Sequence, residues 1–361
     1  QDCFRRHLPR TAPRHARAMH IGSALAAVLV HQLANVSQVR PPSGPQKAPL
    51  LVATVRQEAQ PQPADGTARG QCASQRAHAG AGQEALAIAT IITDEDNIEK
   101  YIQGAVALGA SLLEHLTLRV DKLLLVRENL TLPREEVKRL RAVGWRLGEM
   151  PTIIPPRPPS FKHFAHQFSK LALWNLTRYS RILYMDADTF ALGKLDPAFD
   201  VVMDKDQYLA AARDFRYGQL SSAFNMGVAV LRPDKEEYQR LLRLLMEDNV
   251  TYQQNWAEQG FLGAVYRRHH AELPFEFNGN VACEDQKPDM WNDALPNIRV
   301  VHFTLCKPWK CKSNESRYCG QYDHWKYFLQ RGELLAEQKT KGKAQSYKAK
   351  KRKAKEWTRN A

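Results

Sequence analysis

Two acidic residues stand one position apart where a buried strand is expected to end. The stretch RILYMDADTF, residues 181–190, is mostly apolar up to Met185 and then carries Asp186 and Asp188. Ligands of open α/β sheets bind at the carboxyl ends of strands, and a period of two points both side chains the same way. Neighbouring carboxylates repel each other, and a divalent cation relieves that repulsion. The pair therefore indicates either a turn or a metal site.

The D-x-D spacing alone does not decide between these interpretations, because acidic pairs are common as helix caps and turn residues. The chain contains two further pairs of this kind, Asp94/Asp96 and Asp204/Asp206. The position directly after a strand distinguishes 186/188 from both. His302 also follows a predicted strand, IRVV, and a histidine ligand beside carboxylates favours Mn²⁺ over Mg²⁺. Beside Asp186 and Asp188, His302 is thus a candidate third ligand of a metal site, which would take Mn²⁺ with Mg²⁺ as the alternative; the family resemblance described below implies this same ligand set.

Strands and helices alternate along the part of the chain that carries these residues. Apolar runs predict the strands ALAIATII, KLLLV, RILYM, YLAAA, FNMGVAVLRP and IRVVHF. Helical spacing of apolar residues predicts helices at 98–113, 134–145, 161–174 and 234–248, and the five prolines of PTIIPPRPP predict a loop. Strand–helix–strand units imply a parallel sheet covered by helices. The predicted fold class is α/β, with a mixed, mostly parallel sheet in a single domain.

The net charge of +14 belongs to the two ends of the chain. The first 40 residues carry a net charge of +5 and the last 23 carry +9, so the segment between them is neutral. With no recognisable nucleic-acid module, we predict no specific nucleic-acid partner. The predicted organisation is a basic N-terminus with the signal-peptide-like run IGSALAAVLV (1–40), a disordered Pro/Gly-rich linker (41–83), the folded domain (84–335) and a basic disordered tail (336–361).

Two features favour a secretory compartment. N-x-[ST] glycosylation sequons occur at Asn35, Asn129, Asn175, Asn249 and Asn314. Four cysteines cluster near the end of the folded part, at Cys283, Cys306, Cys311 and Cys319. No CxxC pair is present, so disulfides in an oxidising lumen explain the cluster better than zinc, which is the minority interpretation. We expect the Golgi or endoplasmic reticulum lumen, with the cytoplasm as the alternative.

Several motifs in order resemble the retaining glycosyltransferases of family 8, the glycogenin-like group. They are FSKLALWNLTRYSRILYMDADTFAL, FNMGVAVLRP, EQGFL and VVHFTLCKPW, and the resemblance covers about 85–325. It implies the GT-A fold, the Rossmann-like fold of nucleotide-diphospho-sugar transferases. It also implies a UDP-sugar donor, with UDP-glucose as the first expectation, and a metal that bridges the diphosphate.

The resemblance assigns roles to further residues. Lys307 would neutralise the leaving UDP phosphate, Lys170 would lie over the donor, and Glu258 would be the carboxylate near the sugar. The remaining predicted contacts to the UDP-sugar are Thr90, Thr93, Ala187, Asn225 and Gln259, with Asp214 and Gly227 at the sugar or the acceptor.

The chain departs from glycogenin in three places. Glu258 stands where glycogenin has aspartate, and the segment HFTLCKPW is one residue shorter. No tyrosine lies between Tyr266 and Tyr318, where glycogenin carries its self-glucosylated tyrosine. Self-priming is therefore not expected, and both a covalent intermediate and attack from the leaving-group face remain open.

The leading hypothesis is a Mn²⁺-dependent hexosyltransferase acting from a UDP-sugar on a glycan, glycoprotein or glycolipid. The alternatives are a cytosolic glycogenin-like glucan primer and a non-catalytic GT-A module that binds a nucleotide or glycan. Membrane association through the N-terminus or basic tail, and a homodimer, are both left open.

Overall fold

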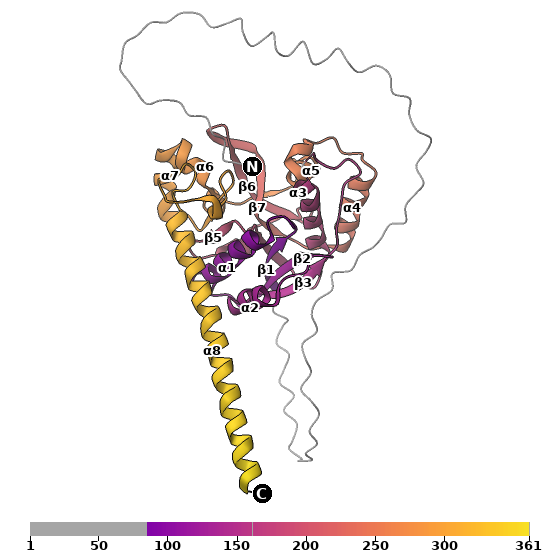
Figure 1. Cartoon of the computed structure of the whole chain (residues 1–361). Coiled ribbons are helices and arrows are strands. Elements are labelled where there is room, and N and C mark those ends of the chain that lie inside the picture. Colours follow the sequence, from indigo (N-terminus) through magenta and orange to yellow (C-terminus); the bar gives the residue numbers. More distant parts are fainter. Residues whose placement is uncertain (1–84, 161, 361) are drawn as a thin grey trace, which may run out of the picture. The chain divides into compact units, whose positions relative to one another are not determined.

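The computed structural model describes residues 85–160 and 162–360, and these residues are built around a seven-stranded sheet (Figure 1). The strand order is β3-β2-β1-β4-β7-β6-β8, and a second sheet of three strands has the order β5-β10-β9. The predicted N-terminal apolar run, the linker and the sequon at Asn35 lie outside the described residues.

The large sheet contains β1 (Leu86–Ile92), β2 (Asp121–Arg127), β3 (Arg146–Met150), β4 (Arg181–Met185), β6 (Leu209–Arg216), β7 (Gln219–Leu231) and β8 (Ala271–Glu272). The small sheet contains β5 (Thr189–Ala191), β9 (Gly279–Asn280) and β10 (Val300–His302). The helices are α1 (Ile98–His115), α2 (Arg134–Ala142), α3 (Lys162–His166), α4 (Lys235–Met246), α5 (Ala257–Val265), α6 (Val281–Gln286), α7 (Pro288–Ala294) and α8 (Tyr322–Asn360). Every predicted strand is present, whereas β3, β5, β8 and β9 were not predicted, because none of them contains an apolar run.

The large sheet has a parallel half and a mostly antiparallel half. β1 pairs in parallel with β2 and with β4, and β2 pairs in parallel with β3. β7 pairs antiparallel with both β4 and β6, and β8 is parallel to β6. The predicted mixed, mostly parallel sheet is therefore confirmed.

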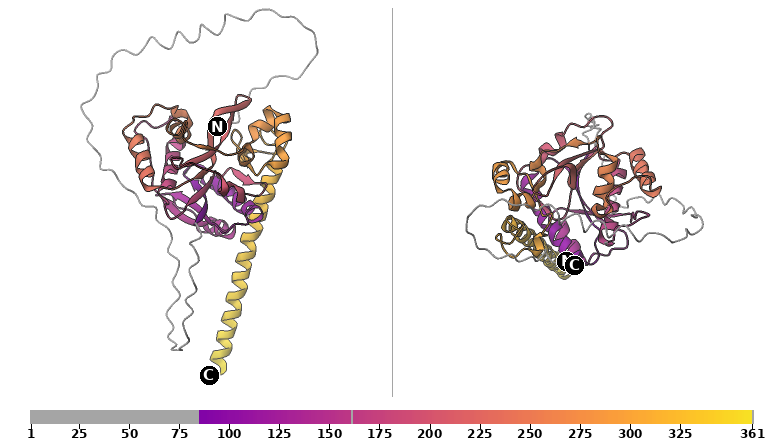
Figure 2. Two further views of the ribbon diagram at one scale, coloured as in Figure 1. Left: turned by 180° about the vertical axis from the view of Figure 1, so that it is seen from behind. Right: turned by 90° about the horizontal axis from the view of Figure 1, so that it is seen from above.

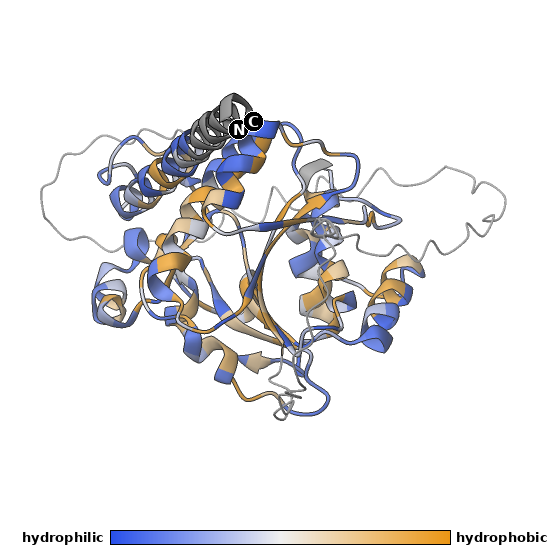
Figure 3. Ribbon diagram, turned by 90° about the horizontal axis from the view of Figure 1, so that it is seen from below, coloured by the Kyte–Doolittle hydropathy of each residue, from blue (hydrophilic) through white to orange (hydrophobic). Residues whose placement is uncertain are grey.

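Alternate residues of each central strand contribute to two cores, one on each face of the sheet. In β4, Leu183 and Met185 join the core that contains α1, α2 and the first turns of α8. Ile182 and Tyr184 face the opposite core, which contains α4, α5 and the segment before β4. Figure 2 shows helices on both faces of the sheet, and Figure 3 shows that its strands are mainly hydrophobic. Period-two alternation thus builds a rigid support whose strand ends carry the polar residues.

The segment predicted as one helix over 161–174 differs in its hydrogen bonding. After the short α3, residues Gln167–Asn175 form a 3₁₀-helix, η1. Seven consecutive residues of this segment, from Phe168 to Trp174, are buried. A one-sided amphipathic helix would expose part of such a run, whereas this segment packs between the sheet, α4 and α5.

The predicted disordered tail is wrong for the described residues, because α8 runs without a break from Tyr322 to Asn360 (Figure 1). Its sequence is rich in Ala, Lys, Glu and Gln, which are strong helix formers, and it contains no proline. Its first turns are anchored in the core by Trp325 and Phe328, and it packs against α1 and α2. Among the described residues, no helix is both long and apolar enough to cross a membrane.

Candidate active site

The two acids of the opening motif lie in a tight turn between β4 and β5. The Asp186 N–H donates to the Gly227 carbonyl at 2.7 Å, which continues the β4–β7 ladder by one residue. The Asp186 carbonyl accepts from the Thr189 N–H at 3.0 Å and from the Thr189 hydroxyl at 2.7 Å. The backbone therefore makes the turn, and the two carboxylates remain available for another purpose.

The pairing of β5 with β10 brings His302 to this turn. In that antiparallel pair His302 lies opposite Thr189, the residue that follows Asp188. The His302 Nε2 atom is 3.4 Å from Asp188 Oδ1 and 4.0 Å from Asp186 Oδ2. One ligand atom from each of the three residues lies within 4.8 Å of the others. The three side chains predicted from the sequence thus converge.

The surroundings of these three residues fit a divalent cation. Asp188 Oδ1 is buried and has no hydrogen-bond partner among the described residues, so a cation would satisfy it. Gly227 leaves space beside the imidazole, because a Cβ there would lie 2.0 Å from His302 Cε1. Two carboxylates and one imidazole form a donor set that suits Mn²⁺.

A chain of hydrogen bonds fixes the orientation and tautomer of His302. The Gly227 N–H can only donate, and it donates to Asn225 Oδ1 at 2.8 Å. Asn225 Oδ1 also accepts from Asn278 Nδ2 at 3.0 Å, so the Asn278 oxygen faces His302. His302 Nδ1 lies 2.9 Å from that oxygen and must therefore donate to it. The lone pair of a neutral His302 consequently lies on Nε2, which faces the two carboxylates.

Lys307 is ion-paired with Asp188 through Nζ and Oδ2, and it also donates to the Phe303 carbonyl at 3.2 Å. Burial opposes the charged forms of both residues. The opposite charges outweigh burial, so the pKa of Asp188 is lowered by Lys307 and His302, and the pKa of Lys307 is raised by Asp188. Lys307 is therefore a fixed cation beside the candidate metal ligands.

A second buried lysine lies on the other side of Asp186. Lys170 Nζ is 2.6 Å from Glu258 Oε1 and 3.3 Å from Asp186 Oδ1. It also lies over the Tyr184 ring, 4.6 Å from the ring centre. Burial would lower the pKa of Lys170, but the two carboxylates raise it. Burial raises the pKa of Glu258, and Lys170 opposes that shift. Glu258 is therefore held in a buried ion pair.

Two cavities meet at Lys170 and Asp186, which line both. The main cavity has a volume of about 570 Å³, and the narrow cavity has a volume of about 60 Å³. The predicted residues that line the main cavity are Asn225, Gly227, Glu258, Gln259 and His302, and those that line the narrow cavity are Thr93, Ala187, Asp188 and Lys307. An elongated ligand with an anionic centre could thus extend from one cavity to the other past the acids.

Two predicted contact residues line neither cavity. Thr90 is fully buried within β1. Asp214 lies behind the wall of the main cavity, where its carboxylate accepts from Arg216, from Asn225 at 3.0 Å and from Gln259 at 3.3 Å. In this position Asp214 orients the amides of Asn225 and Gln259.

Three side chains at the site were not predicted. Asn278 is the partner of His302, and Tyr184 donates its hydroxyl hydrogen to Asp186. Tyr101 lines the narrow cavity, and burial raises its pKa to about 12. Alternation in β4 could have placed Tyr184 on the side opposite Met185. Nothing in the local sequence separates Asn278 from an ordinary loop asparagine.

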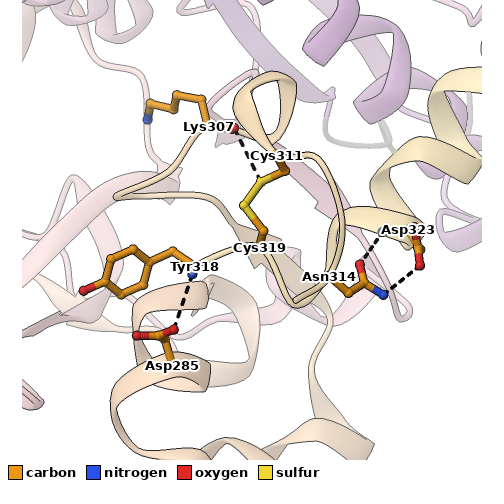
Figure 4. The surroundings of a disulfide bond; sticks show 7 residues. All are labelled: Asp285, Lys307, Cys311, Asn314, Tyr318, Cys319 and Asp323. Carbon is orange, nitrogen blue, oxygen red and sulfur yellow. Dashed lines mark hydrogen bonds between the residues drawn. A yellow bond between two sulfur atoms is a disulfide. The ribbon is translucent and has the colours of Figure 1, made fainter. Parts of the chain in front are cut away.

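The segment that follows Lys307 is closed by a disulfide between Cys311 and Cys319 (Figure 4). Cys283 and Cys306 are buried and lie outside this bond. The Tyr318 N–H, next to the disulfide, donates to Asp285 at 3.4 Å. A disulfide is therefore present as predicted, and the four-cysteine zinc site is not formed.

Comparisons with known proteins agree with this geometry. The model of glycosyl transferase family 8 matches residues 98–313. The UDP-glucuronate:xylan alpha-glucuronosyltransferase 2 of Arabidopsis thaliana is 28% identical over 220 residues, which are 59% of this chain and 34% of that protein. Glycogenin of Neurospora crassa is 27% identical over 231 residues, which are 62% of this chain and 32% of that protein. The chain thus spans about one third of the length of these relatives.

Among solved structures, the apo form of the bifunctional glycosyltransferase WbbM superimposes with a TM-score of 0.52 and 17% identity. The match covers 69% of this chain and 50% of that one. At this level of identity the likeness concerns the fold, and it confirms the predicted GT-A architecture.

Proposed function

Since the chain belongs to glycosyltransferase family 8, we propose that it transfers a hexosyl group from a UDP-sugar to a glycan, glycoprotein or glycolipid. The observation that carries the proposal is the convergence of Asp186, Asp188 and His302, with Asp188 Oδ1 buried and without a hydrogen-bond partner among the described residues. The hydrogen-bond chain that turns Nε2 of His302 toward the carboxylates supports it.

The residues of the site would share the work of the reaction. A divalent cation held by Asp186, Asp188 and His302 would supply positive charge for the donor diphosphate. Lys307 would add a second positive charge where the leaving UDP becomes more negative, so that its effect is greatest in the transition state. Asn225 and Gln259, which donate to Asp214, would each have a second amide hydrogen for the sugar at the wall of the main cavity.

Glu258 and Lys170 would shape the sugar-facing end of the site. The pair is almost completely buried, and Glu258 Oε2 has no hydrogen-bond partner among the described residues. Ala257, directly before Glu258, has a φ of 48°, which L-residues rarely adopt. Trp256, which precedes Ala257, is exposed, and Glu258, which follows it, is buried. We propose that the Glu258 carboxylate stabilises positive charge that develops on the sugar.

The donor can be identified with a panel of UDP-Glc, UDP-Gal, UDP-GlcA, UDP-GlcNAc and UDP-Xyl, each tested with and without Mn²⁺. We expect one UDP-sugar to raise the thermal unfolding temperature of the protein in a Mn²⁺-dependent way. We also expect slow hydrolysis of that UDP-sugar, in which the hexosyl group is transferred to water and UDP is released. A donor that binds but never releases UDP, with or without added acceptors, would favour the non-catalytic alternative. Failure of every UDP-sugar to bind would contradict the proposal.

We also propose a secretory location. Three of the sequons, at Asn129, Asn249 and Asn314, are on exposed residues, and a disulfide closes the segment after Lys307. Exposed sequons and disulfides are both expected of a protein that folds in an oxidising lumen.

A further inference from the structure

A large groove lies next to the main cavity, and Gln259 is its one lining residue that the proposal above assigns to the donor. Its volume is about 760 Å³. The walls come from the end of β6 and the start of β7, from α5 with the segment before it, and from the residues that follow α5. We call it the arginine groove, and its charged and aromatic lining residues are Arg216, Arg267, Arg268, His270, Tyr252, Trp256 and Phe224.

The charge of the arginine groove has one sign. Three arginines line it, and no aspartate or glutamate does. Arg267 and Arg268 are exposed, and neither forms an ion pair within the described residues. Hydroxyl and amide side chains such as Ser221, Thr251 and Gln253 complete the lining. Unpaired cations among hydrogen-bonding groups form a surface for a ligand that is both polyhydroxylated and anionic.

The arginine groove continues into the main cavity, because Arg216, Trp256 and Gln259 line both. The Arg216 guanidinium lies 3.5 Å from the centre of the Trp256 ring and is ion-paired with Asp214. Its Nη1 atom has no hydrogen-bond partner among the described residues. A ligand chain in the groove would therefore reach the site of transfer past a fixed cation and an exposed indole face.

The floor of the arginine groove contains a helix glycine that internal packing does not require. Gly263 lies inside α5, where glycine costs roughly 1 kcal/mol relative to alanine. A Cβ at Gly263 would meet no atom within 4 Å. Gly260, one turn earlier, is different, because a Cβ there would lie 2.4 Å from the Gln253 carbonyl. Gly263 therefore leaves space in the arginine groove that a larger side chain would fill.

We propose that the arginine groove binds an acidic glycan, carboxylated or sulfated, whose end enters the main cavity as the acceptor. The inference rests on the proposed function for the transfer step, and it adds the chemical class of the acceptor. Arg267 and Arg268 would contact acidic groups several sugar units from the reacting end. Trp256 would lie against a sugar ring near the boundary between the two cavities.

Binding can be measured without any donor. Calorimetric titration of the whole chain with a sulfated hexasaccharide, a hexauronate and neutral maltohexaose should give clear binding of at least one acidic probe and at least tenfold weaker binding of the neutral one. The affinity should fall as salt is raised. Tighter binding of the sulfated hexasaccharide would indicate a sulfated acceptor, and tighter binding of the hexauronate would indicate a carboxylated one. Equal binding of the neutral probe, or equal binding of an oligonucleotide of the same charge, would overturn the proposal.

Two variants locate the binding site. Arg267→Ala/Arg268→Ala should weaken the acidic probe about tenfold, the effect expected for the loss of two solvent-accessible charge contacts. Gly263→Trp should fill the floor and abolish binding. The matched controls are Arg119→Ala/Arg134→Ala, which removes two exposed charges elsewhere, and Gly263→Ala, which should retain binding and leave the helix at least as stable. Unchanged affinity in both groove variants would contradict the assignment.

A second readout separates this inference from the proposed function. Donor-dependent thermal stabilisation and UDP release to water should be unchanged in both groove variants, while transfer to the acidic probe falls. If wild-type protein binds the acidic probe in the groove but no UDP-sugar, the proposed function fails and the binding groove stands. If UDP is released but no acidic probe binds, the inference about the acceptor fails alone.

Discussion

A backbone amide, that of Gly227, determines how the imidazole of His302 is oriented. Because this N–H must donate, each amide in the chain through Asn225 and Asn278 can have only one orientation. Gly227 also leaves the space that the imidazole occupies. The orientation of His302 is thus fixed by residues that are not candidate metal ligands themselves.

Replacing Asn278 with leucine should therefore weaken the metal site. The variant loses the acceptor for His302 Nδ1, so the tautomer with a lone pair on Nε2 is no longer selected. Loss of such a partner typically costs about 10- to 100-fold in metal affinity. The Mn²⁺ concentration that gives half-maximal UDP release should rise by that factor, with Asn297→Leu, at an exposed position, as the control. An unchanged Mn²⁺ requirement in Asn278→Leu would show that this partner is not needed.

The Lys170–Glu258 pair makes a prediction about stability. Both side chains are 3% exposed, so Glu258→Gln leaves the Lys170 charge with only the more distant Asp186. Breaking a buried pair on one side costs about 3–5 kcal/mol. Urea unfolding of the metal-free protein should show this loss in Glu258→Gln. The double variant Lys170→Met/Glu258→Gln should lose much less free energy of unfolding than the two single variants lose together. Losses that simply add would contradict the pairing of the two side chains.

At the residue scale the sequence identified the side chains that converge at the candidate metal site, but it did not predict which residues orient them. Asp186, Asp188, His302 and Lys307 follow strands, and the ends of strands can be read from apolar runs. Asp214 was predicted to touch the sugar or acceptor, yet it lies behind the cavity wall, because its role depends on contacts with residues far away in the chain.

At the scale of elements, the connection between α1 and β2 depends on one carboxylate. Asp196 accepts from the Leu118 N–H at 2.7 Å and from the Thr117 N–H at 3.0 Å, and it also accepts from the Thr117 hydroxyl at 2.9 Å. Burial raises the pKa of Asp196, but these hydrogen bonds outweigh it and lower the pKa below its usual value. A lowered pKa means that the ionised form stabilises the fold above the unfolded-state pKa, and that this contribution is lost as the pH falls through the folded-state pKa.

Asp196→Ala should therefore destabilise the protein by about 1 kcal/mol at pH 7, the usual order of the net contribution of a hydrogen bond to stability. The difference from wild type should shrink as the pH falls from about 4 toward 2. Urea unfolding at several pH values measures it, with Asp293→Ala, at an exposed position, as the control. A difference that stays constant over this range would show that the carboxylate charge does not contribute.

Strands within an apolar run were predictable even when short, and short strands without such a run were not. β5 and β10 have only three residues each, and their pairing brings His302 to Asp188. The pattern of β10 was visible as IRVVHF, but that of β5 was not, because TFA follows the acids without any alternation. The basic C-terminal segment was predicted to be disordered from its charge pattern, but it is helical, because its residues are strong helix formers.

At the scale of the whole molecule, the sequons test the proposed compartment. Asn129, Asn249 and Asn314 are exposed, whereas Asn175 is partly buried at the end of η1. After expression through the secretory pathway, we expect endoglycosidase to lower the apparent mass of the wild type. The variant with glutamine at the three exposed positions should lose most of that shift, and Asn175→Gln should lose little of it. Absence of any glycan on the wild type would favour a cytoplasmic location.

The fold class, the family and the candidate metal ligands follow from strand–helix alternation and from motifs in their order along the chain. The arginine groove could not be predicted, because its lining comes from the β6–β7 hairpin and from both ends of α5. Its arginines carry no signal in a sequence whose excess charge lies at the two ends. Surfaces assembled from several elements become visible only once the fold is known.

The central claim is that Asp186, Asp188 and His302 hold a divalent cation for a UDP-sugar. Anomalous diffraction at the manganese edge, from crystals grown with Mn²⁺ and UDP, tests it most directly. The account predicts one strong peak between the three side chains, next to the UDP diphosphate, which disappears in Asp188→Asn. A peak that persists in that variant, or manganese bound elsewhere with UDP, would contradict the account.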